Sequence, residues 1–453
     1  MTPVEAALTV GTAVVGSRRT QPSRLWAYSV YALIFSGILL IGHYQFHVIV
    51  PRVLAVAMRT PWVRLLAYLG VFWAGLGLLL ILVRTLLWIA YRPAAAATRE
   101  GAPSLTVVIP AYNEGAMVLK SIESAVHADY PRDRLEILVI DDGSKDDTWD
   151  YIRQAAERYP GLVTALRHEC NRGKREALAL GFTRARGEVL VTIDSDSVIE
   201  ADALLAITGP FRDPRIGAVA GKVLVYNRMQ GLIPRMLDVR FILSFDMLRA
   251  AESVYRNVYC CPGALTALRA SAVGRVLERW QHQEFLGSRC TFGEDRAMTN
   301  YLLDQGYDSV YQRTAIVHTV VPQAFGKLCK MLLRWDRSYV REEIRFARIV
   351  WKRPWPTRIL AAFDRFITNV SYPISLCGLI VMPAVLKQDP TIAGSMLIVM
   401  GALSLFNMLY YLRSERSLDF LYGVLYAYFY SFALFWIFPY AVLTVRSRGW
   451  LTR

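Results

Sequence analysis

Apolar residues are concentrated in five long runs near the two ends of the chain, whereas the middle alternates between short apolar and polar stretches. Two runs precede the middle region and three follow it: Leu25–Tyr44, Val63–Tyr91, Ile367–Val385, Thr391–Leu412 and Phe420–Val445. Wound as α-helices, they are long enough to cross a hydrocarbon core about 30 Å thick. We therefore predict membrane helices at both ends. A buried helix of a globular domain explains two successive runs with basic flanks less well, and a cleaved signal peptide would start earlier and be shorter.

The middle region, from about Arg99 to Val320, has the pattern of a sheet covered by helices. Its strand-like runs are apolar almost throughout: Leu105–Pro110, Glu136–Ile140 and Glu188–Ile193. Segments of helical pattern, Met117–Ala128 and Asp147–Arg158, lie between them. Apolar strands that alternate with helices predict a mostly parallel sheet covered on both faces, which is an α/β fold.

Charge adds one feature to this organisation. The chain has a net charge of +15, and its cations crowd a segment just before the distal apolar runs. They are Lys327, Lys330, Arg334, Arg337, Arg341, Arg345, Arg348, Lys352 and Arg353. Apolar residues alternate with them at helical spacing, which indicates a basic amphipathic helix on an anionic membrane surface rather than a nucleic-acid-binding protein. The positive-inside rule then places the middle region in the cytosol.

Polar residues follow each predicted strand. The first strand runs into Pro110–Glu114, the second into Asp141–Ser144 and the third into Asp194–Asp196. Ligands of such sheets bind beyond the carboxyl ends of the strands, so these acidic segments are expected to converge on one site. Converging carboxylates repel one another, and a divalent metal that bridges a diphosphate would relieve the repulsion. A lone Asp-x-Asp triplet is often a solvated loop, but three acidic strand ends indicate a site.

A basic turn, Asn171-Arg-Gly-Lys-Arg175, begins a helix-like run between the second and third strands. Its cations could hold phosphate oxygens, and Gly173 would let the backbone approach them closely. Alone, the turn could simply be solvated. Beside the acidic strand ends, it favours phosphate binding. The six cysteines lack metal-binding and paired spacings and are expected to be reduced structural thiols.

Eight strings of the chain carry a resemblance to a known family: VVIPAYNE, VIDDGSKD, NRGKREA, TIDSDS, CPGALTALR, EFLG, FGEDRAMTNYLLDQG and LLRWDRSYVRE. In this order they resemble the family 2 glycosyltransferases of the GT-A fold, and especially the hyaluronan synthases and the nodulation chitin-oligosaccharide synthases. The resemblance covers about Leu105 to Arg341 and continues more loosely to the C-terminus. It implies a cytosolic α/β domain of the GT-A type inserted between N- and C-terminal α-helical transmembrane segments.

For the donor, the resemblance implies a nucleotide site of seven residues: Tyr112, Glu114, Asp142, Lys174, Asp194, Arg334 and Arg453. The first three would surround the uridine of a UDP-sugar. Lys174 and Arg334 would meet the diphosphate, and Asp194 would contact the nucleotide. Asp196 would ligate the Mg²⁺ or Mn²⁺ that bridges the phosphates.

For the acceptor, Asp295 of Gly293-Glu-Asp-Arg296 matches the family's general base. A single base supports direct displacement with inversion, so an α-linked UDP-sugar gives a β-linked product. Trp335 matches the aromatic platform beneath the acceptor sugar. The other residues assigned to the acceptor side are Cys261, Gly263 and Glu294. From the residues alone, Asp295 could instead pair with Arg296, and Trp335 could be a membrane-interface tryptophan.

Two features concern the match to the family. Met331 stands where the usual Gln-x-x-Arg-Trp motif has glutamine, and a thioether cannot hydrogen-bond as an amide does, so acceptor positioning is expected to differ. The tail Trp450–Arg453 matches one thought to reach the nucleotide site, yet two proximal and three distal spans would leave it outside. Either Phe420–Val445, which contains Pro439, forms a short hairpin, or the tail is extracellular and its motif is accidental.

The resulting hypothesis is an inverting, metal-dependent, processive synthase that uses UDP-GlcNAc with UDP-glucuronate to make and export a hyaluronan-type β-linked polysaccharide. The alternatives are a chitin-oligosaccharide synthase that uses UDP-GlcNAc only, a cellulose-type glucan synthase, a lipid-linked single-sugar transferase and a non-enzymatic export subunit. The expected partners are the UDP-sugar, the growing polysaccharide and the bilayer of the cell membrane, with no nucleic acid and an undetermined oligomeric state.

The predicted division of the chain has six parts. They are a cytosolic tail (1–24), two transmembrane helices (25–92), the catalytic domain (93–322), basic amphipathic interfacial helices (323–356), a transmembrane bundle (357–446) and a C-terminal tail (447–453).

Overall fold

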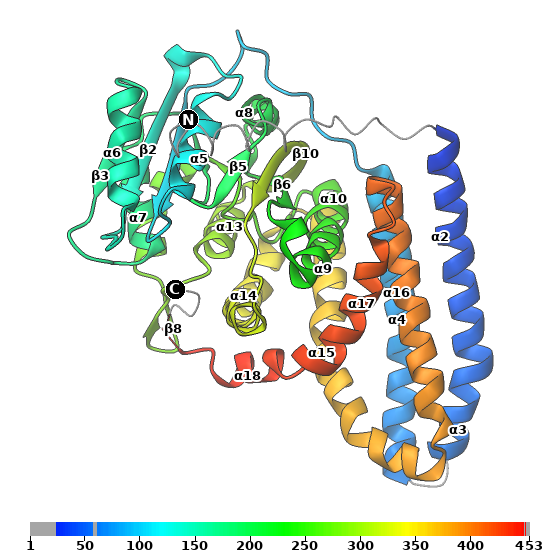
Figure 1. The fold of residues 1–453 in the computed structure, drawn as a ribbon. Coiled ribbons are helices and arrows are strands. Elements are labelled where there is room, and N and C mark those ends of the chain that lie inside the picture. The colour runs from blue at the N-terminus through cyan, green and yellow to red at the C-terminus, as the bar shows by residue number, and fades with distance from the viewer. Residues whose placement is uncertain (1–23, 58–60, 448, 450–453) are drawn as a thin grey trace. The chain divides into compact units, whose positions relative to one another are not determined.

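The computed structural model describes residues 24–57, 61–447 and 449, and it divides the chain into two compact units. Among these residues, the first unit holds Tyr91–Arg353 and the chain from Phe435 onward. The second unit holds residues 24–90 and Pro354–Leu434. The first unit contains a sheet with helices packed on it, and the second is helical (Figure 1).

An eight-stranded sheet forms the centre of the first unit, with the strand order β3-β2-β1-β4-β7-β6-β10-β5 (Figure 1). Its strands are β1 (Leu105–Ala111), β2 (Leu135–Asp141), β3 (Val163–Arg167), β4 (Val189–Thr192), β5 (Ser197–Ile199), β6 (Ile216–Val225), β7 (Thr266–Arg269) and β10 (Asp308–Thr319). The strands β3, β2, β1 and β4 are mutually parallel, and β6 is parallel to β10. The strand β7 is antiparallel to both of its neighbours, and β5 is antiparallel to β10.

The predicted α/β fold is confirmed. All three predicted strands are present as β1, β2 and β4. Every residue of β1 is buried, because helices cover both faces of the sheet, and this burial explains the continuous apolar run in the sequence. Sequence reasoning did not predict β3 or the strands after β4.

Helices connect the parallel strands by crossovers. The helix α5 (Met117–Val126) packs against β1 and β2, and α6 (Thr148–Arg158) packs against β2 and β3. The helix α7 (Lys174–Arg184) packs against β1 and β2. Because the chain returns from the edge strand β3 to β4, right-handed crossovers place α5 and α6 on one face of the sheet and α7 on the other.

The remaining helices of the first unit follow the strand β5. They are α8 (Ala203–Thr208), α9 (Leu232–Phe241), the π-helical η5 (Ile242–Met247), α10 (Leu248–Val254), α11 (Ala270–Gly274), α12 (Leu277–Gln281), α13 (Glu294–Asp304), α14 (Phe325–Ile349) and α18 (Ile437–Leu443). A small hairpin of β8 (Glu284–Phe285) and β9 (Ser288–Arg289) precedes α13. Short 3-10 turns occupy Arg132–Arg134, Gly209–Arg212, Arg228–Gln230 and Val350–Lys352.

Strand register brings the predicted polar segments to one edge of the sheet. Ala111 at the end of β1 pairs with Asp141 at the end of β2, and Val108 pairs with Thr192 at the end of β4. These strands are parallel, so the residues that follow them leave the sheet in the same direction.

Seven of the nine cations of the basic segment lie on one continuous helix, α14, whereas Lys352 and Arg353 follow it. Its cations do not all face outward: Arg337 and Arg341 are buried, and Arg341 donates a 2.6 Å hydrogen bond to the carbonyl of Phe292. The placement of this segment on a lipid surface stays a prediction.

The helix α18 packs against α14 within the first unit. There the guanidinium of Arg337 donates to the hydroxyl of Thr444 at 2.9 Å, and the rings of Tyr339 and Phe438 lie 6.3 Å apart. The predicted division placed this part of the chain in a bundle spanning 357–446. In the structure, the helices on either side of residues 435–436 are bent by 46° and α18 belongs to the first unit, and the extent of the predicted bundle stays a prediction.

The second unit consists of α2 (Arg24–Tyr44), the π-helical η1 (Gln45–Ile49), α3 (Val50–Ala57), α4 (Pro61–Ala90), α15 (Trp355–Gln388), α16 (Thr391–Glu415), α17 (Phe420–Phe429) and the π-helical η7 (Tyr430–Leu434). Within this unit Arg84 of α4 forms a 2.8 Å ion pair with Asp364 of α15. This pair is set among apolar helices and holds the two together.

Three of the described helices are long and apolar enough to cross a membrane: Tyr28–Arg52, Arg64–Ala90 and Thr391–Glu415. The bent pair Phe420–Leu434 and Ile437–Leu443 makes a fourth candidate if it counts as one span. These segments coincide with four of the predicted apolar runs. The fifth run, Ile367–Val385, lies in α15, which is not among the candidates in the described chain, so its membrane assignment stays a prediction.

Candidate active site

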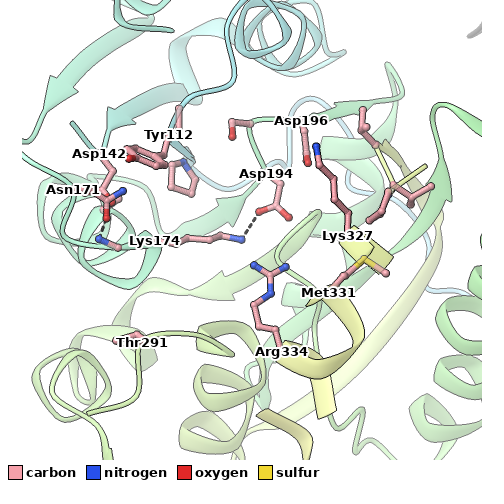
Figure 2. Close-up of a pocket in the computed structure, with 18 of the residues that line it drawn as sticks. Tyr112, Asp142, Asn171, Lys174, Asp194, Asp196, Thr291, Lys327, Met331 and Arg334 are labelled. Atoms are coloured by element: carbon pink, nitrogen blue, oxygen red, sulfur yellow. Dashed lines mark hydrogen bonds and ion pairs between the residues drawn. The ribbon is translucent and has the colours of Figure 1, made fainter. Parts of the chain in front are cut away.

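A cavity of about 880 Å³ lies at the carboxyl edge of β1, β2 and β4 (Figure 2). Six of the residues assigned to the nucleotide and the metal line it: Tyr112, Asp142, Lys174, Asp194, Asp196 and Arg334. The strand ends, the basic turn and α14 therefore meet in one place. Met331 also lines the cavity, so the departure from the family motif faces the same space as these residues. Thr291 and Gln323 line it as well, and no sequence signal marked them.

Asp142 holds the basic turn in position. Its carboxylate accepts hydrogen bonds from the backbone N–H groups of Arg172 at 3.0 Å and Gly173 at 2.7 Å. Gly173 has a φ of +96°, a conformation that side-chain-bearing residues rarely adopt. His168 Nδ1 lies 2.8 Å from the same carboxylate, and sequence reasoning missed this residue because no motif surrounds it.

Lys174 is the first residue of α7 and lies between two carboxylates. Its ammonium is 2.5 Å from Asp194 (Figure 2) and 3.1 Å from Glu294. Burial alone would lower the pKa of Lys174, but the negative charges of Asp194 and Glu294 outweigh burial and raise it. The side chain therefore stays cationic inside the site.

The donor set of the cavity fits a divalent metal bound together with a diphosphate. In the described part of the chain, no group of three or more His, Cys, Asp or Glu residues is arranged to hold a metal ion. Mg²⁺ commonly binds through one or two carboxylates plus substrate phosphates, so such a group is not required. Asp196 could supply a carboxylate ligand with Asp194 close by, and Lys174 and Arg334, which line the same cavity, could supply charge for phosphate.

Asp295 lies in the first turn of α13, lining a smaller cavity with Cys261, Gly263 and Glu294. The N–H of Arg296 donates to its carboxylate at 2.7 Å, and the N–H of Gly263 lies 3.4 Å from it. A Cβ on Gly263 would come within 2.8 Å of the Lys174 ammonium and 3.2 Å of the Asp194 carboxylate. Gly263 therefore lies beside both Asp295 and the Lys174–Asp194 pair that faces the larger cavity, and a side chain at this position would crowd that pair.

Two adjacent carboxyl groups at the start of α13 have opposite pKa shifts. Burial and the neighbouring charge of Glu294 raise the pKa of Asp295. Burial would raise the pKa of Glu294 too, but Lys174 and Arg175 outweigh it and lower that pKa. Environments that separate two pKa values in this way suit one carboxylate that stays ionised and one that exchanges a proton.

The guanidinium of Arg296 pairs elsewhere. It lies 3.4 Å from Glu343 and 5.1 Å from the centroid of the Tyr339 ring, whereas the hydrogen bond to the Asp295 carboxylate comes from the backbone N–H of Arg296. The alternative in which Asp295 serves as an ion-pair partner of Arg296 is therefore not what the structure contains.

The start of α13 is held rigidly against its surroundings. The indole N–H of Trp280 donates to the carbonyl of Glu294 at 2.8 Å. Gly293 has a φ of +73°, and a Cβ there would lie 2.0 Å from the hydroxyl of Ser338 on α14. Only glycine combines this backbone conformation with this close approach.

Trp335 lines neither of these two cavities. Its ring lies 6.2 Å from that of Phe241 and 6.3 Å from that of Phe245, in an aromatic group that the sequence did not predict. Glu114 does not line the larger cavity, and its carboxylate accepts a 3.0 Å hydrogen bond from the hydroxyl of Ser195. The roles of Trp335 and Glu114 stay predictions, and Trp450 and Arg453 lie outside the described residues.

Comparison with known proteins agrees with this arrangement. The family model "Glycosyl transferase family 2" matches residues 106–277. The hyaluronan synthase of Streptococcus pyogenes is 31% identical over 355 residues, which cover 77% of this chain and 83% of that protein. An N-acetylglucosaminyltransferase of Azorhizobium caulinodans is 28% identical over 359 residues, which cover 78% of this chain and 87% of that protein.

Among solved structures, a mannosyltransferase of Pyrobaculum calidifontis in complex with GDP-Man and Mn²⁺ is similar, with a TM-score of 0.53. The match covers 89% of this chain and 98% of that one at 20% identity. At this identity the likeness shows a shared fold, the GT-A-like sheet domain.

Proposed function

The chain belongs to glycosyl transferase family 2 and is a UDP-sugar glycosyltransferase, and we propose that it is a membrane-bound, inverting synthase of a hyaluronan-type β-linked polysaccharide. In this proposal it uses UDP-GlcNAc with UDP-glucuronate and extends and exports the chain processively. One observation carries the proposal: the acidic strand ends, Lys174 and Arg334 share one cavity, and Asp295, whose pKa is raised, lies beside Gly263, which adjoins Lys174 and Asp194.

The donor would bind in the larger cavity. Tyr112 lies at the β1 end of the cavity, beside Asp142 and the basic turn, and would meet the uridine (Figure 2). Lys174 and Arg334 would meet the diphosphate, because their charges face the space between the strand ends and α14. Mg²⁺ or Mn²⁺, bound by Asp196 and phosphate oxygens, would stabilise the charge that develops on the departing UDP.

Asp295 would act as the general base. It would take the proton from an acceptor hydroxyl as that oxygen attacks the anomeric carbon, while UDP leaves from the opposite face. The raised pKa of Asp295 makes it a stronger base than an exposed aspartate. Lys174 and Arg334 would stabilise the leaving diphosphate, and the product is then a β-linkage.

The apolar helices support membrane attachment of this enzyme, with the first unit on the cytoplasmic side of the cell membrane. Cations of α14 and the following segment, including Lys327 and Lys352, support the cytoplasmic placement by the positive-inside rule. We propose that α14 and Trp335 form the opening through which the growing polysaccharide leaves the catalytic site. Each sugar transfer would then move the polysaccharide outward.

A second candidate is a chitin-oligosaccharide synthase that uses UDP-GlcNAc alone. Met331 favours it, because this residue faces the cavity where the family motif has glutamine and provides no amide to hold a growing chain. The similarity to N-acetylglucosaminyltransferases also favours it.

A donor screen distinguishes the two candidates. The full-length protein in lipid, supplied with Mg²⁺ or Mn²⁺, is given UDP-GlcNAc, UDP-glucuronate and UDP-glucose singly and in pairs, and UDP release and product size are measured. Polymer that forms only when UDP-GlcNAc and UDP-glucuronate are supplied together supports the hyaluronan-type synthase. Product from UDP-GlcNAc alone supports the second candidate. Absence of UDP release from every donor would contradict both.

A further inference from the structure

A third cavity, of about 890 Å³, lies in the first unit and shares no lining residue with either cavity of the candidate active site. It is formed by α12, the β8–β9 hairpin, Tyr301 of α13 and the C-terminal half of α14. The same stripe of α14 reaches this cavity and the larger active-site cavity, because Lys327, Met331 and Arg334 continue at helical spacing into Arg341, Arg345 and Arg348.

Arginines dominate the charge of this third cavity. Four line it, Arg279, Arg341, Arg345 and Arg348, together with His282 and only two carboxylates, Glu278 and Glu284. Nearby cations have acidic partners: Arg296 pairs with Glu343, and Lys352 pairs with Asp304. In the part of the chain that the structure describes, no ion pair is found for Arg279, Arg345 or Arg348.

Two of these arginines are already oriented. The guanidinium of Arg345 lies 3.4 Å from the centroid of the Tyr301 ring. Such stacking fixes the plane of the guanidinium and leaves its edge N–H groups available for a two-pronged contact with phosphate or carboxylate. Arg341 is 3% exposed and is fixed by the Phe292 carbonyl and by Glu342. Side chains fixed before binding lose little conformational entropy when a ligand arrives.

The rim of the cavity is apolar. Leu286 in the β8–β9 turn is 65% exposed and Ile344 on α14 is 50% exposed, and both line the cavity. A ligand with a phosphate head and an apolar tail could contact both kinds of surface, whereas a free phosphate would use the arginines alone.

We propose that this cavity binds a phosphate-bearing anion, either the headgroup of an anionic phospholipid or free phosphate, through Arg345 and Arg348 beside the buried Arg341. The site would adjoin the catalytic helix, because Arg341 donates to the carbonyl of Phe292, two residues before Glu294. This inference does not depend on the sugar that the enzyme transfers.

Binding of two probes to the full-length protein in a neutral detergent tests the proposal. Inorganic phosphate is titrated by calorimetry, and dioleoyl phosphatidylglycerol, with dioleoyl phosphatidylcholine as the neutral control, is followed by native mass spectrometry. We expect the double variant Arg345→Ala/Arg348→Ala to bind at least one anionic probe about tenfold more weakly than the wild type, as the loss of charge-assisted hydrogen bonds implies. Arg275→Ala, which removes an exposed arginine that does not line the cavity, should bind as the wild type does.

The two probes distinguish the sources. A loss confined to phosphatidylglycerol identifies a lipid headgroup, and a loss for phosphate as well identifies a free-anion site. Equal binding of both probes by the wild type and the double variant would overturn the proposal. If the double variant unfolds at a lower temperature, Arg348→Glu replaces it, because Arg348 is exposed and its substitution leaves the packing of Tyr301 intact.

Discussion

The ammonium of Lys174 lies 3.1 Å from the carboxylate of Glu294, although the two residues are 120 positions apart and begin different helices. Lys174 also contacts Asp194 in the larger cavity, and Glu294 directly precedes Asp295. A single lysine therefore connects the proposed phosphate site to the proposed base. The positive charge of Lys174 lowers the pKa of both Glu294 and Asp295, and the negative charge of Glu294 raises the pKa of Asp295.

Replacement of Lys174 by alanine should weaken UDP binding by about tenfold or more, because a charge-assisted phosphate contact is lost and Asp194 and Glu294 are left without their shared cation. Calorimetric titration of UDP measures the effect. Lys145→Ala removes an exposed lysine that does not line the cavity and should leave UDP affinity unchanged. Equal affinities for the two variants would remove Lys174 from the donor site.

The rate of sugar transfer should depend on the ionisation of Asp295. Because its pKa is raised, protonation begins at a higher pH than for an exposed aspartate, so activity should fall as the pH drops through this raised value. Glu294→Gln removes a negative charge that raises the pKa of Asp295, while Lys174, Arg296 and Cys260 remain around it. We expect the acid limb of the pH–rate profile to move to lower pH.

The shape of the profile, rather than its height, carries this test, because Glu294→Gln also disturbs Lys174. Glu157→Gln, an exposed change on α6, should keep the wild-type profile. An acid limb that stays in place or moves to higher pH in Glu294→Gln would show that the two carboxyl groups are not coupled as described.

Gly293→Ala should destabilise the protein more than Gly306→Ala. Both glycines have positive φ, +73° and +91°, so each substitution costs about 1 kcal/mol in backbone strain. Only Gly293 faces a neighbour: its Cβ would lie 2.0 Å from the Ser338 hydroxyl, whereas nothing lies within 4 Å at Gly306. Overpacking of this kind adds about 1–3 kcal/mol. Thermal unfolding of the two full-length variants measures the difference, and equal midpoints would contradict the close approach.

The end of the described chain should lie on the same side of the membrane as the catalytic sheet. The hydroxyl of Ser288 donates a 2.8 Å hydrogen bond to the carbonyl of Arg446, which ties this segment to the first unit. In a variant with Cys170 and Cys377 replaced by serine and Ser447→Cys introduced, a membrane-impermeant maleimide should label residue 447 in inside-out vesicles only. A control variant keeps Cys170, which is exposed on the first unit, and lacks the cysteine at 447. Labelling of Cys170 shows which vesicles expose the side of the membrane that carries the catalytic sheet. Labelling of residue 447 in right-side-out vesicles would place the tail outside.

Much of the fold could be predicted because the strands β1, β2 and β4 are buried on both faces and therefore read as continuous apolar runs. The strand β3 was not predicted, since it lies at the sheet edge and four of its five residues are partly exposed or exposed. The bend before α18 was not predicted, because the alternative considered for Phe420–Val445 was a short hairpin. An apolar run does not reveal whether its end packs against lipid or, as α18 does, against α14.

Within the candidate site, local motifs identified the residues that line the cavity but not the contacts that orient them. Lys174 could be associated with phosphate from its turn, yet its contact with Glu294 depends on the tertiary packing of α7 and α13. His168 and Trp280 position site residues through single hydrogen bonds and have no sequence pattern that marks this role. Trp335, assigned by resemblance, lies among phenylalanines that come from a different helix.

The transfer rate of Asp295→Asn, measured together with its UDP affinity, tests the central claim most directly. Asparagine keeps the size of the side chain and cannot accept a proton, so transfer should fall by about 10²- to 10⁴-fold while UDP affinity stays as in the wild type. Asp304→Asn, the same change at the far end of α13, should retain near-normal transfer. Near-normal turnover in Asp295→Asn would contradict the account, because the proposed base would then be dispensable.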